Sequence, residues 1–382
     1  MIPYGKQNIN QDDIDAVIEV LKSDFITQGP KIPAFEKSII DYTGAKYATA
    51  ANSATSALHI ACLALGVGKG DIVWTSPITF VASANCALYC GAEVDFVDID
   101  EKSFNMSVQA LEEKLVRARK LNKLPKVVIP VHLCGQSCDM EKINKLSSQY
   151  NFKIIEDASH AIGGKYKAEP IGDCKYSDIT VFSFHPVKII TTAEGGIATT
   201  NDGKLSEKMN MFRSHGVTRD EALMTEPSHG SWYYQQIELG FNYRMTDIQA
   251  ALGLSQMKRL DHFVKTRNSL ADRYDELLNN LPLDTPLQSS DCLSSRHLYV
   301  IQLNNADDRK QVFDQMRSND IGVNLHYAPV HLQPYYQKFG YKKGDYPAAE
   351  AYYSKAISIP LFADLSHDEQ LEVVDTLEKS LS

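Results

Sequence analysis

The strongest constraint on the fold is the alternation of short apolar strand patterns with amphipathic helical patterns between residues 47 and 200. Alternation of this kind generates a mostly parallel sheet that helices cover on both faces. The expected strands are 72–76, 94–98, 126–131, 153–157, 178–183 and 196–200, and the expected helices are 55–65, 81–89, 108–120 and 140–149. We therefore predict an α/β fold for this part of the chain.

The segments on either side of this region predict an N-terminal arm and a second, smaller domain. Residues 12–22 have the pattern of one amphipathic helix, and a turn-rich stretch follows it. Apolar residues recur at helical spacing over 245–278, which favours one long connecting helix. The tail predicts strands at 297–303 and 322–327 and helices at 309–316, 348–357 and 367–380. We expect an arm and large domain over 1–245 and a small α+β domain over 246–382.

Composition excludes several classes of protein. The 382 residues carry a net charge of −9 without a long basic run, so nucleic acid is not an expected partner. No segment has the roughly 20 apolar residues that cross a bilayer, and the N-terminus lacks a signal pattern. We expect a cytoplasmic protein without a membrane partner. The seven cysteines cannot all pair within the chain, which favours reduced thiols.

Two neighbouring strand ends carry an amine and a carboxylate. Lys188 follows the strand expected at 178–183, and Asp157 ends the strand expected at 153–157. Most lysines are solvated on the surface, but apolar residues surround Lys188 in the sequence, and a desolvated lysine is nucleophilic. An amine that forms a Schiff base and a carboxylate that holds a protonated pyridine nitrogen are what pyridoxal phosphate requires. The sequence therefore predicts a pyridoxal phosphate site.

Weaker signals accompany this pair. The helix expected from residue 55 begins at Asn52–Ser56, which suits a phosphate, although such residues taken alone are more often an ordinary N-cap. Phe80 could stack on a heteroaromatic ring or lie in the core, and His160 could contact a cofactor or a local carbonyl. His132, Cys134 and Cys138 are possible zinc ligands, but without a second pair they are poor support for a site, and we predict no metal.

The motifs assembled in order resemble one enzyme family. Ser53–Ser56, Phe80, EDASHA, SFHPVK and GFNYRMTDIQAALG together are similar to the sugar aminotransferases of the DegT/DnrJ/EryC1/StrS family. This resemblance implies fold type I of the pyridoxal phosphate enzymes and a homodimer with active sites at the subunit interface. It also implies transfer of an amino group from L-glutamate to a keto sugar that a nucleotide carries.

The resemblance also implies roles for individual residues. Lys188 matches the lysine that binds the cofactor, and Asp157 matches the partner of the pyridine nitrogen. Asn242 matches a residue that reaches the cofactor phosphate from the other subunit. The remaining cofactor positions that the resemblance implies are Ala54, Thr55, Phe80, His160 and Ser183. Some family members have histidine at the lysine position and remove a hydroxyl, and Lys188 argues against that branch.

A narrower likeness concerns the substrate. TSPITFVASAN, FRSHG, SSRHLYVIQL and LHYAPVHLQPYYQ resemble the branch that serves pseudaminic acid synthesis. That branch aminates C4 of a UDP-linked 4-keto-6-deoxy-N-acetylhexosamine and makes UDP-4-amino-4,6-dideoxy-N-acetyl-β-L-altrosamine. Ala328 departs from the pattern, because a lysine near it normally contacts the sugar nucleotide. The substrate positions that this likeness implies are Tyr4, Asp24, Phe25, Ile26, Thr27, Asn324, Leu325, His326 and Tyr327.

Alternatives stay open at this point. The chain could aminate a different nucleotide-linked 4-keto or 3-keto sugar. A non-catalytic protein that binds pyridoxal phosphate or a sugar nucleotide is a reading from another class. Arg213, Arg219 and Arg244 are all candidates for binding the carboxylates of glutamate.

Overall fold

The centre of the computed structural model, which describes residues 1–381, is a seven-stranded mixed sheet. Its order is β1-β9-β8-β5-β4-β2-β3, and only β9 runs antiparallel to its neighbours. The strands are β1 (Tyr47–Ala51), β2 (Ile72–Thr75), β3 (Glu93–Phe96), β4 (Val127–Ile129), β5 (Lys153–Asp157), β8 (Ile179–Ser183) and β9 (Gly196–Thr200). The predicted mostly parallel sheet is confirmed; β1 was not expected from the sequence.

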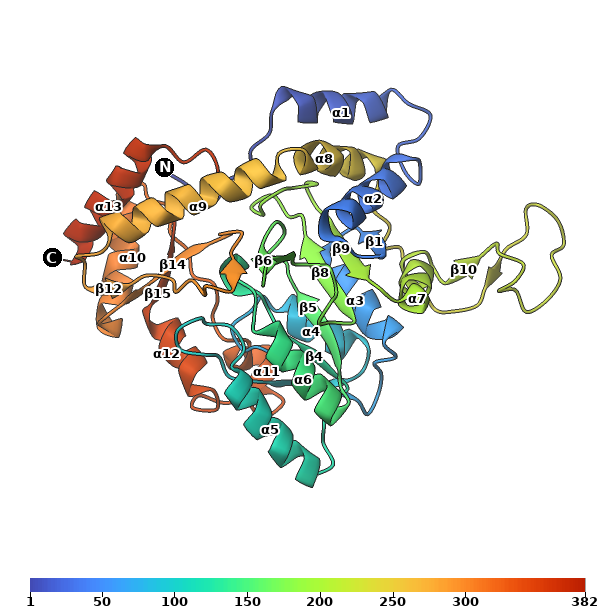
Figure 1. The fold of residues 1–382 in the computed structure, drawn as a ribbon, viewed down its shortest axis with the longest axis horizontal. Coiled ribbons are helices and arrows are strands. Elements are labelled where there is room, and N and C mark those ends of the chain that lie inside the picture. The colour runs from blue at the N-terminus through green and yellow to red at the C-terminus, as the bar shows by residue number, and fades with distance from the viewer. Residues whose placement is uncertain (382) are drawn as a thin grey trace.

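The helices that cover this sheet are α2 (Lys31–Thr43), α3 (Ala54–Ala64), α4 (Ala82–Tyr89), α5 (Val108–Lys120), α6 (Met140–Tyr150), α7 (Gly203–Arg213) and α8 (Asp247–Met257). They lie on both faces because consecutive strand residues point to opposite sides. Val73, Ile155 and Val181 pack with α3, α4 and α7, whereas the residues beside them in the same strands pack on the opposite face. That second face is covered by α5 and α6 over one half and by α2 and α8 over the other (Figure 1).

The N-terminal arm has two helices rather than the single helix that we expected. α1 (Gln11–Leu21) begins at Asn10 with a capping box and lies along α8. α2 follows the turn-rich stretch and buries Phe35 and Ile39 against the large sheet. The sequence signal for α2 is weak because its N-terminus has no side-chain cap.

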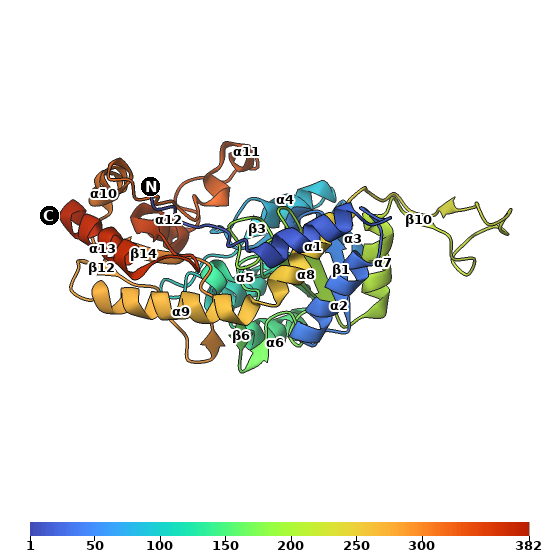
Figure 2. The same ribbon diagram turned by 90° about the horizontal axis from the view of Figure 1, so that it is seen from above.

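A smaller α+β unit follows. The antiparallel strands β12 (Leu283–Asp284), β14 (Tyr299–Leu303) and β15 (Ala356–Ile359) pack with α9 (Leu260–Leu277), α10 (Arg309–Ser318) and α13 (His367–Leu381) around a second core. Ile2 joins that core, so the first residues of the chain lie with the last ones (Figures 1 and 2). The remaining elements are α11 (Pro334–Gln337), α12 (Pro347–Lys355), β6 (Lys165–Tyr166), β7 (Glu169–Pro170) and β13 (Cys292–Leu293).

Two expectations for the C-terminal part were wrong. The long helix over 245–278 is two helices, α8 and α9, because the chain turns at Lys258 and Arg259 and the Arg259 guanidinium binds the buried Asp13 carboxylate. The strand expected at 322–327 is absent from the described residues. Asn324 pairs with Ser358 only as an isolated bridge, and the following side chains line a cavity instead.

One hairpin projects from the body. Strands β10 (Val217–Thr218) and β11 (Gln235–Gln236) lie in an extension beyond α7 that stands clear of the rest of the protomer in both views (Figures 1 and 2). Trp232 and Leu239 are 73% and 77% exposed there.

Two further expectations can be compared with the fold. Within residues 1–381 the helices are all too short or too polar to cross a bilayer. All seven cysteines fall in this range and are free thiols. The division of the chain at residue 245 stays a prediction.

Candidate active site

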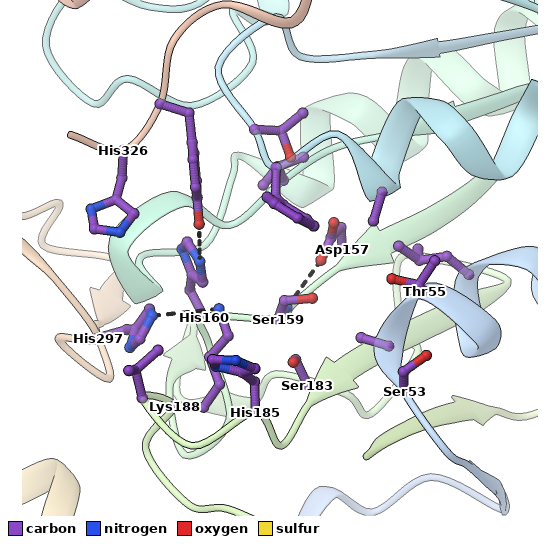
Figure 3. A pocket seen from close by; sticks show the side chains of 18 of the residues that line it. Ser53, Thr55, Asp157, Ser159, His160, Ser183, His185, Lys188, His297 and His326 are labelled. Atoms are coloured by element: carbon purple, nitrogen blue, oxygen red, sulfur yellow. Dashed lines mark hydrogen bonds between the residues drawn. The ribbon is translucent and has the colours of Figure 1, made fainter. Parts of the chain in front are cut away.

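The carboxyl ends of the parallel strands meet at one edge of the large sheet. Because β1, β4, β5 and β8 run in the same direction, the residues that follow them converge there. A cavity of about 600 Å³ opens at this edge, and the small unit closes one side of it with His297 and Asn324–Tyr327 (Figure 3). Ligands of α/β proteins bind at such an edge.

Lys188 projects into this cavity from the loop between β8 and β9. Two backbone hydrogen bonds of Phe184, one donated to Gly195 O and one accepted from Thr192 N, close that loop. Burial lowers the pKa of Lys188 to about 8, although the Asp157 carboxylate acts in the opposite direction. The amine is therefore much more often neutral near pH 8 than an ordinary lysine, and a neutral amine is the nucleophilic form.

The Asp157 carboxylate is 5% exposed at the end of β5. Ser83 Oγ donates to Asp157 Oδ2 at 2.6 Å, and the Ser159 backbone N–H donates to Oδ1 at 3.1 Å. Each carboxylate oxygen can accept more than one hydrogen bond, so Asp157 can also accept a hydrogen bond from a protonated ring nitrogen in the cavity. The two donors fix its orientation.

The first turn of α3 offers two unpaired backbone donors. Ser53 Oγ accepts from Ser56 N, and Ser53 O accepts from Ala57 N, so these two amides are occupied. Within residues 1–381 the amides of Ala54 and Thr55 have no acceptor, and both residues line the cavity together with Ser183. Free N–H groups at the positive end of a helix bind phosphate.

His160 is fixed in one neutral form. Its Nδ1 accepts from the Cys134 N–H at 3.3 Å, so Nε2 carries the proton that faces Tyr327 Oη at 3.0 Å. Burial first, and then the charge of Lys188, hold the pKa of His160 well below its ordinary value. Phe80 is 60% exposed and lines the same cavity, with its ring centroid 6.2 Å from that of Tyr327.

The groups that line this cavity fit pyridoxal phosphate. They are an amine with a lowered pKa, an oriented carboxylate and two free amides, which match the aldehyde, the ring nitrogen and the phosphate of that cofactor. Of the expected cofactor residues, only Asn242 lies outside the cavity of this protomer.

The expected substrate residues fall into two groups. Tyr4, Asn324, Leu325, His326 and Tyr327 line the cavity. The other group, which is exposed and outside it, consists of Asp24, Phe25, Ile26 and Thr27. Asn242 lies in the same region of the protomer as this second group, because both are next to the segment that leads into α8.

None of the three candidate arginines lines the cavity of this protomer. Arg213 Nη1 donates to Glu36 Oε1 at 2.5 Å and to Ala50 O at 2.7 Å. Arg213 and Arg244 line a separate hollow beside Gln28, and Arg219 is exposed in the projecting hairpin.

Sequence reasoning did not select Ser83, Ser159 or His297. Ser159 stands inside the motif EDASHA, and Ser83 follows Phe80 by one helical turn, so both were near a signal. His297 comes from the small unit, and only the folded chain brings it to 3.5 Å from Lys188 Nζ.

The possible zinc ligands have other partners. His132 Nε2 lies 2.7 Å from Glu156 Oε2, and the Cys138 thiol donates to Val131 O. No group of histidine, cysteine and acidic side chains in the described part of the chain is arranged to hold a metal ion.

Known proteins match this chain over nearly its whole length. Residues 7–378 match the model of the DegT/DnrJ/EryC1/StrS aminotransferase family. The spore coat polysaccharide biosynthesis protein SpsC of Bacillus subtilis is 39% identical over 98% of this chain and 96% of its own. The UDP-4-amino-4,6-dideoxy-N-acetyl-β-L-altrosamine transaminase of Campylobacter jejuni is 38% identical over 99% of this chain and 96% of its own.

A solved structure agrees with these relatives. Helicobacter pylori PseC, an aminotransferase of pseudaminic acid biosynthesis, superimposes with a TM-score of 0.91 at 31% identity, over 100% of this chain and 99% of that one. The expected fold type I is thereby confirmed. The chain belongs to the DegT/DnrJ/EryC1/StrS family and is a pyridoxal-phosphate-dependent sugar aminotransferase.

Proposed function

We propose that the protein transfers the amino group of L-glutamate to C4 of a UDP-linked 4-keto-6-deoxy-N-acetylhexosamine. The product would be UDP-4-amino-4,6-dideoxy-N-acetyl-β-L-altrosamine, a precursor of pseudaminic acid. The observation that carries the proposal is one cavity that unites Lys188 and Asp157 with Asn324–Tyr327, the segment that the narrower likeness assigns to the sugar nucleotide. The similarity to the Campylobacter transaminase and to PseC supports it.

Different residues of the site have different roles in this reaction. Pyridoxal phosphate, when bound, supplies an aldehyde that links to amines and a ring that accepts electrons. Ala54 and Thr55 hold its phosphate, and Asp157 holds the proton on its ring nitrogen. Lys188 Nζ takes the proton from Cα of glutamate, and in the second half of the reaction it delivers a proton to C4 of the sugar. His297 and Tyr327 help to exclude water from the amine.

We also propose that the working unit is a homodimer whose two sites lie at the interface. Asn242 and Asp24–Thr27 are exposed and outside the cavity of their own protomer, where a second copy could meet them. The exposed Trp232 and Leu239 of the projecting hairpin supply apolar area for that contact.

The visible absorption of the bound cofactor tests the proposed substrate. L-Glutamate should abolish the visible band, and the UDP-linked 4-keto sugar of L-arabino configuration should restore it while the 4-amino sugar forms. Restoration only by another keto sugar would keep the enzyme class and refute the proposed substrate. Failure of glutamate to bleach the band would refute glutamate as the donor.

A second candidate is a different nucleotide-linked keto sugar. Ala328 stands where the narrower likeness expects a lysine contact, and SpsC, whose name points to spore coat polysaccharide, is as similar as the transaminase. A panel of UDP-, dTDP- and GDP-linked 4-keto and 3-keto sugars in the same absorption assay distinguishes the two candidates by which sugar restores the band fastest.

Variants of the two central residues test the assigned roles. Lys188→Ala should lower turnover by about a hundred- to ten-thousandfold, because the proton carrier is lost, while cofactor binds non-covalently. Asp157→Ala should weaken cofactor binding as well as slow the reaction, because the ring nitrogen loses its anion. Release of 2-oxoglutarate measures the turnover of both variants. The exposed Lys204 provides a control, since Lys204→Ala should leave the rate unchanged; a comparable rate in Lys188→Ala would contradict the assignment.

A further inference from the structure

Four histidines line the cavity that holds the amine of Lys188, and three of them, all except the half-exposed His185, are buried. His160 follows β5, His297 precedes β14, and His326 lies in the segment that also contributes Tyr327 (Figure 3). All three are buried, with 4–7% of their surface exposed. Burial first, and then the charge on Lys188, lower the pKa of each of them, so all three are neutral near pH 7. Each neutral ring has one donor and one acceptor nitrogen.

Two of the three rings have partners other than Lys188. His160 uses Nδ1 for the Cys134 amide and Nε2 for the Tyr327 hydroxyl, so both of its nitrogens are occupied. His326 Nδ1 lies 2.8 Å from Ser358 Oγ. His297 Nε2, in contrast, faces Lys188 Nζ at 3.5 Å (Figure 3).

The position of His297 is rigidly set by its backbone. Its N–H donates to Cys134 O at 2.9 Å, and its carbonyl accepts from the buried Arg267 guanidinium at 3.3 Å. The ring packs on that of His160 with centroids 4.4 Å apart. The ammonium form of Lys188 has no lone pair and can only donate, so toward it Nε2 is the acceptor and the ring proton lies on Nδ1.

That proton has no protein partner. His297 Nδ1 is buried without a hydrogen bond to any described residue. Buried donors are nearly always satisfied in folded proteins, so an exception at a cavity suggests that the ring is kept for its other nitrogen. Asp157 is the charged group that acts on Lys188. Its carboxylate favours the ammonium form of the lysine and does not orient a neutral amine.

From this geometry we propose that His297 is a positioning residue for Lys188. It accepts a hydrogen bond from the amine whenever the lysine is not covalently engaged and holds Nζ, with its lone pair free, inside the cavity. This role rests on the proposed function of Lys188. Its consequence is that His297 governs how fast the amine attacks a carbonyl, rather than how tightly the cofactor binds.

Two polar substitutions distinguish this role from a structural one. The side chain of glutamine can place an oxygen near the position of Nε2, whereas that of asparagine ends near Nδ1 and cannot reach Lys188. Full-length apoenzyme is mixed with pyridoxal phosphate at about pH 9.5, where the amine is mostly neutral, and growth of the visible band gives the rate of covalent capture. We expect His297→Asn to slow capture at least about tenfold and His297→Gln to stay within about threefold of the unchanged protein.

Binding of pyridoxamine phosphate, which needs no covalent link, serves as the control. Its Kd should be alike in the unchanged protein and in both variants, and turnover of His297→Asn should show a lower kcat with little change in KM for glutamate. Equal capture rates for Asn and Gln, whether fast or slow, would overturn the role of His297. Undiminished capture by Lys188→Ala would instead refute the assignment of Lys188, so the two failures can be told apart.

Discussion

The neutral histidines around Lys188 make the native protein sensitive to acid. The pKa of His326 is lowered to about 3, and those of His160 and His297 are also lowered, so the unfolded chain binds protons at these residues more readily than the native one. The free energy of unfolding is therefore fully retained above an unfolded-state pKa of about 6.5 and falls below it. At pH 5.5 the loss from His326 is about 1 kcal/mol, and His160 and His297 add to it in the same direction.

A substitution isolates this effect from other titrations. His132 acts in the opposite direction, because its hydrogen bond to the Glu156 carboxylate counters burial and raises its pKa. We therefore compare urea unfolding of the apoprotein at pH 7.5 and 5.5 with and without His326→Asn. The variant should lose about 1 kcal/mol less between these two pH values. Equal losses in both proteins would show that His326 is not kept neutral.

Residues of the site differ in how far the sequence predicts them. Lys188 and Asp157 were predictable because each directly follows or ends a strongly patterned strand. Ser83 and His297 act through distances that depend on packing between elements, and the sequence pattern carries no such information. The pairing of Arg213 with Glu36 illustrates the same limit, because the sequence left Arg213 as one of three candidates for binding glutamate and did not reveal this ion pair.

At the scale of elements, the phosphate end of the cavity depends on the contact between β9 and α3. A Cβ added at Gly196 would lie 2.4 Å from the backbone nitrogen of Ala54 and 2.5 Å from the carbonyl carbon of Ser53. No flexible side chain can yield there, so the first turn of the helix must move. Gly196→Ala should therefore weaken pyridoxal phosphate binding by about tenfold or more, which equilibrium titration of the apoprotein measures.

Gly68 provides the matched control for this substitution. A Cβ at Gly68 meets nothing within 4 Å, so Gly68→Ala should bind the cofactor normally. Normal binding by Gly196→Ala would mean that the free amides of Ala54 and Thr55 do not hold the phosphate.

Elements with regular patterns were predicted well, and those set by tertiary contacts were not. Apart from β1, which was not expected, the strands of the large sheet fall within a few residues of their predicted bounds, because buried strands of such sheets are nearly continuous apolar runs. The break between α8 and α9 leaves the apolar spacing intact, and Arg259 at the break pairs with Asp13, a tertiary contact that the local sequence does not reveal.

At the scale of the whole molecule, the proposed dimer predicts complementation between inactive variants. If each site takes Lys188 from one subunit and Asn242 from the other, then a hybrid of Lys188→Ala with Asn242→Ala contains one intact site. Random mixing makes half of the dimers hybrids, so about a quarter of the full activity should return. Turnover of a co-refolded mixture measures it.

Asp157 supplies the control for this experiment. Lys188 and Asp157 line the same cavity of one protomer, so hybrids of Lys188→Ala with Asp157→Ala should have one defect in each site and no restored activity. Absence of complementation in the Asn242 hybrids as well would contradict a shared site.

The contacts of Ile2 have a consequence for how the protein is made. Its N–H donates to Asp320 O, its carbonyl accepts from Gly322 N, and Tyr4 O accepts from Leu361 N. A growing chain exposes its first residues long before these partners leave the ribosome, and closing so long a loop is slow. The cavity, which Tyr4 also lines, is therefore completed only after residues as far along the chain as Leu361 have been synthesised.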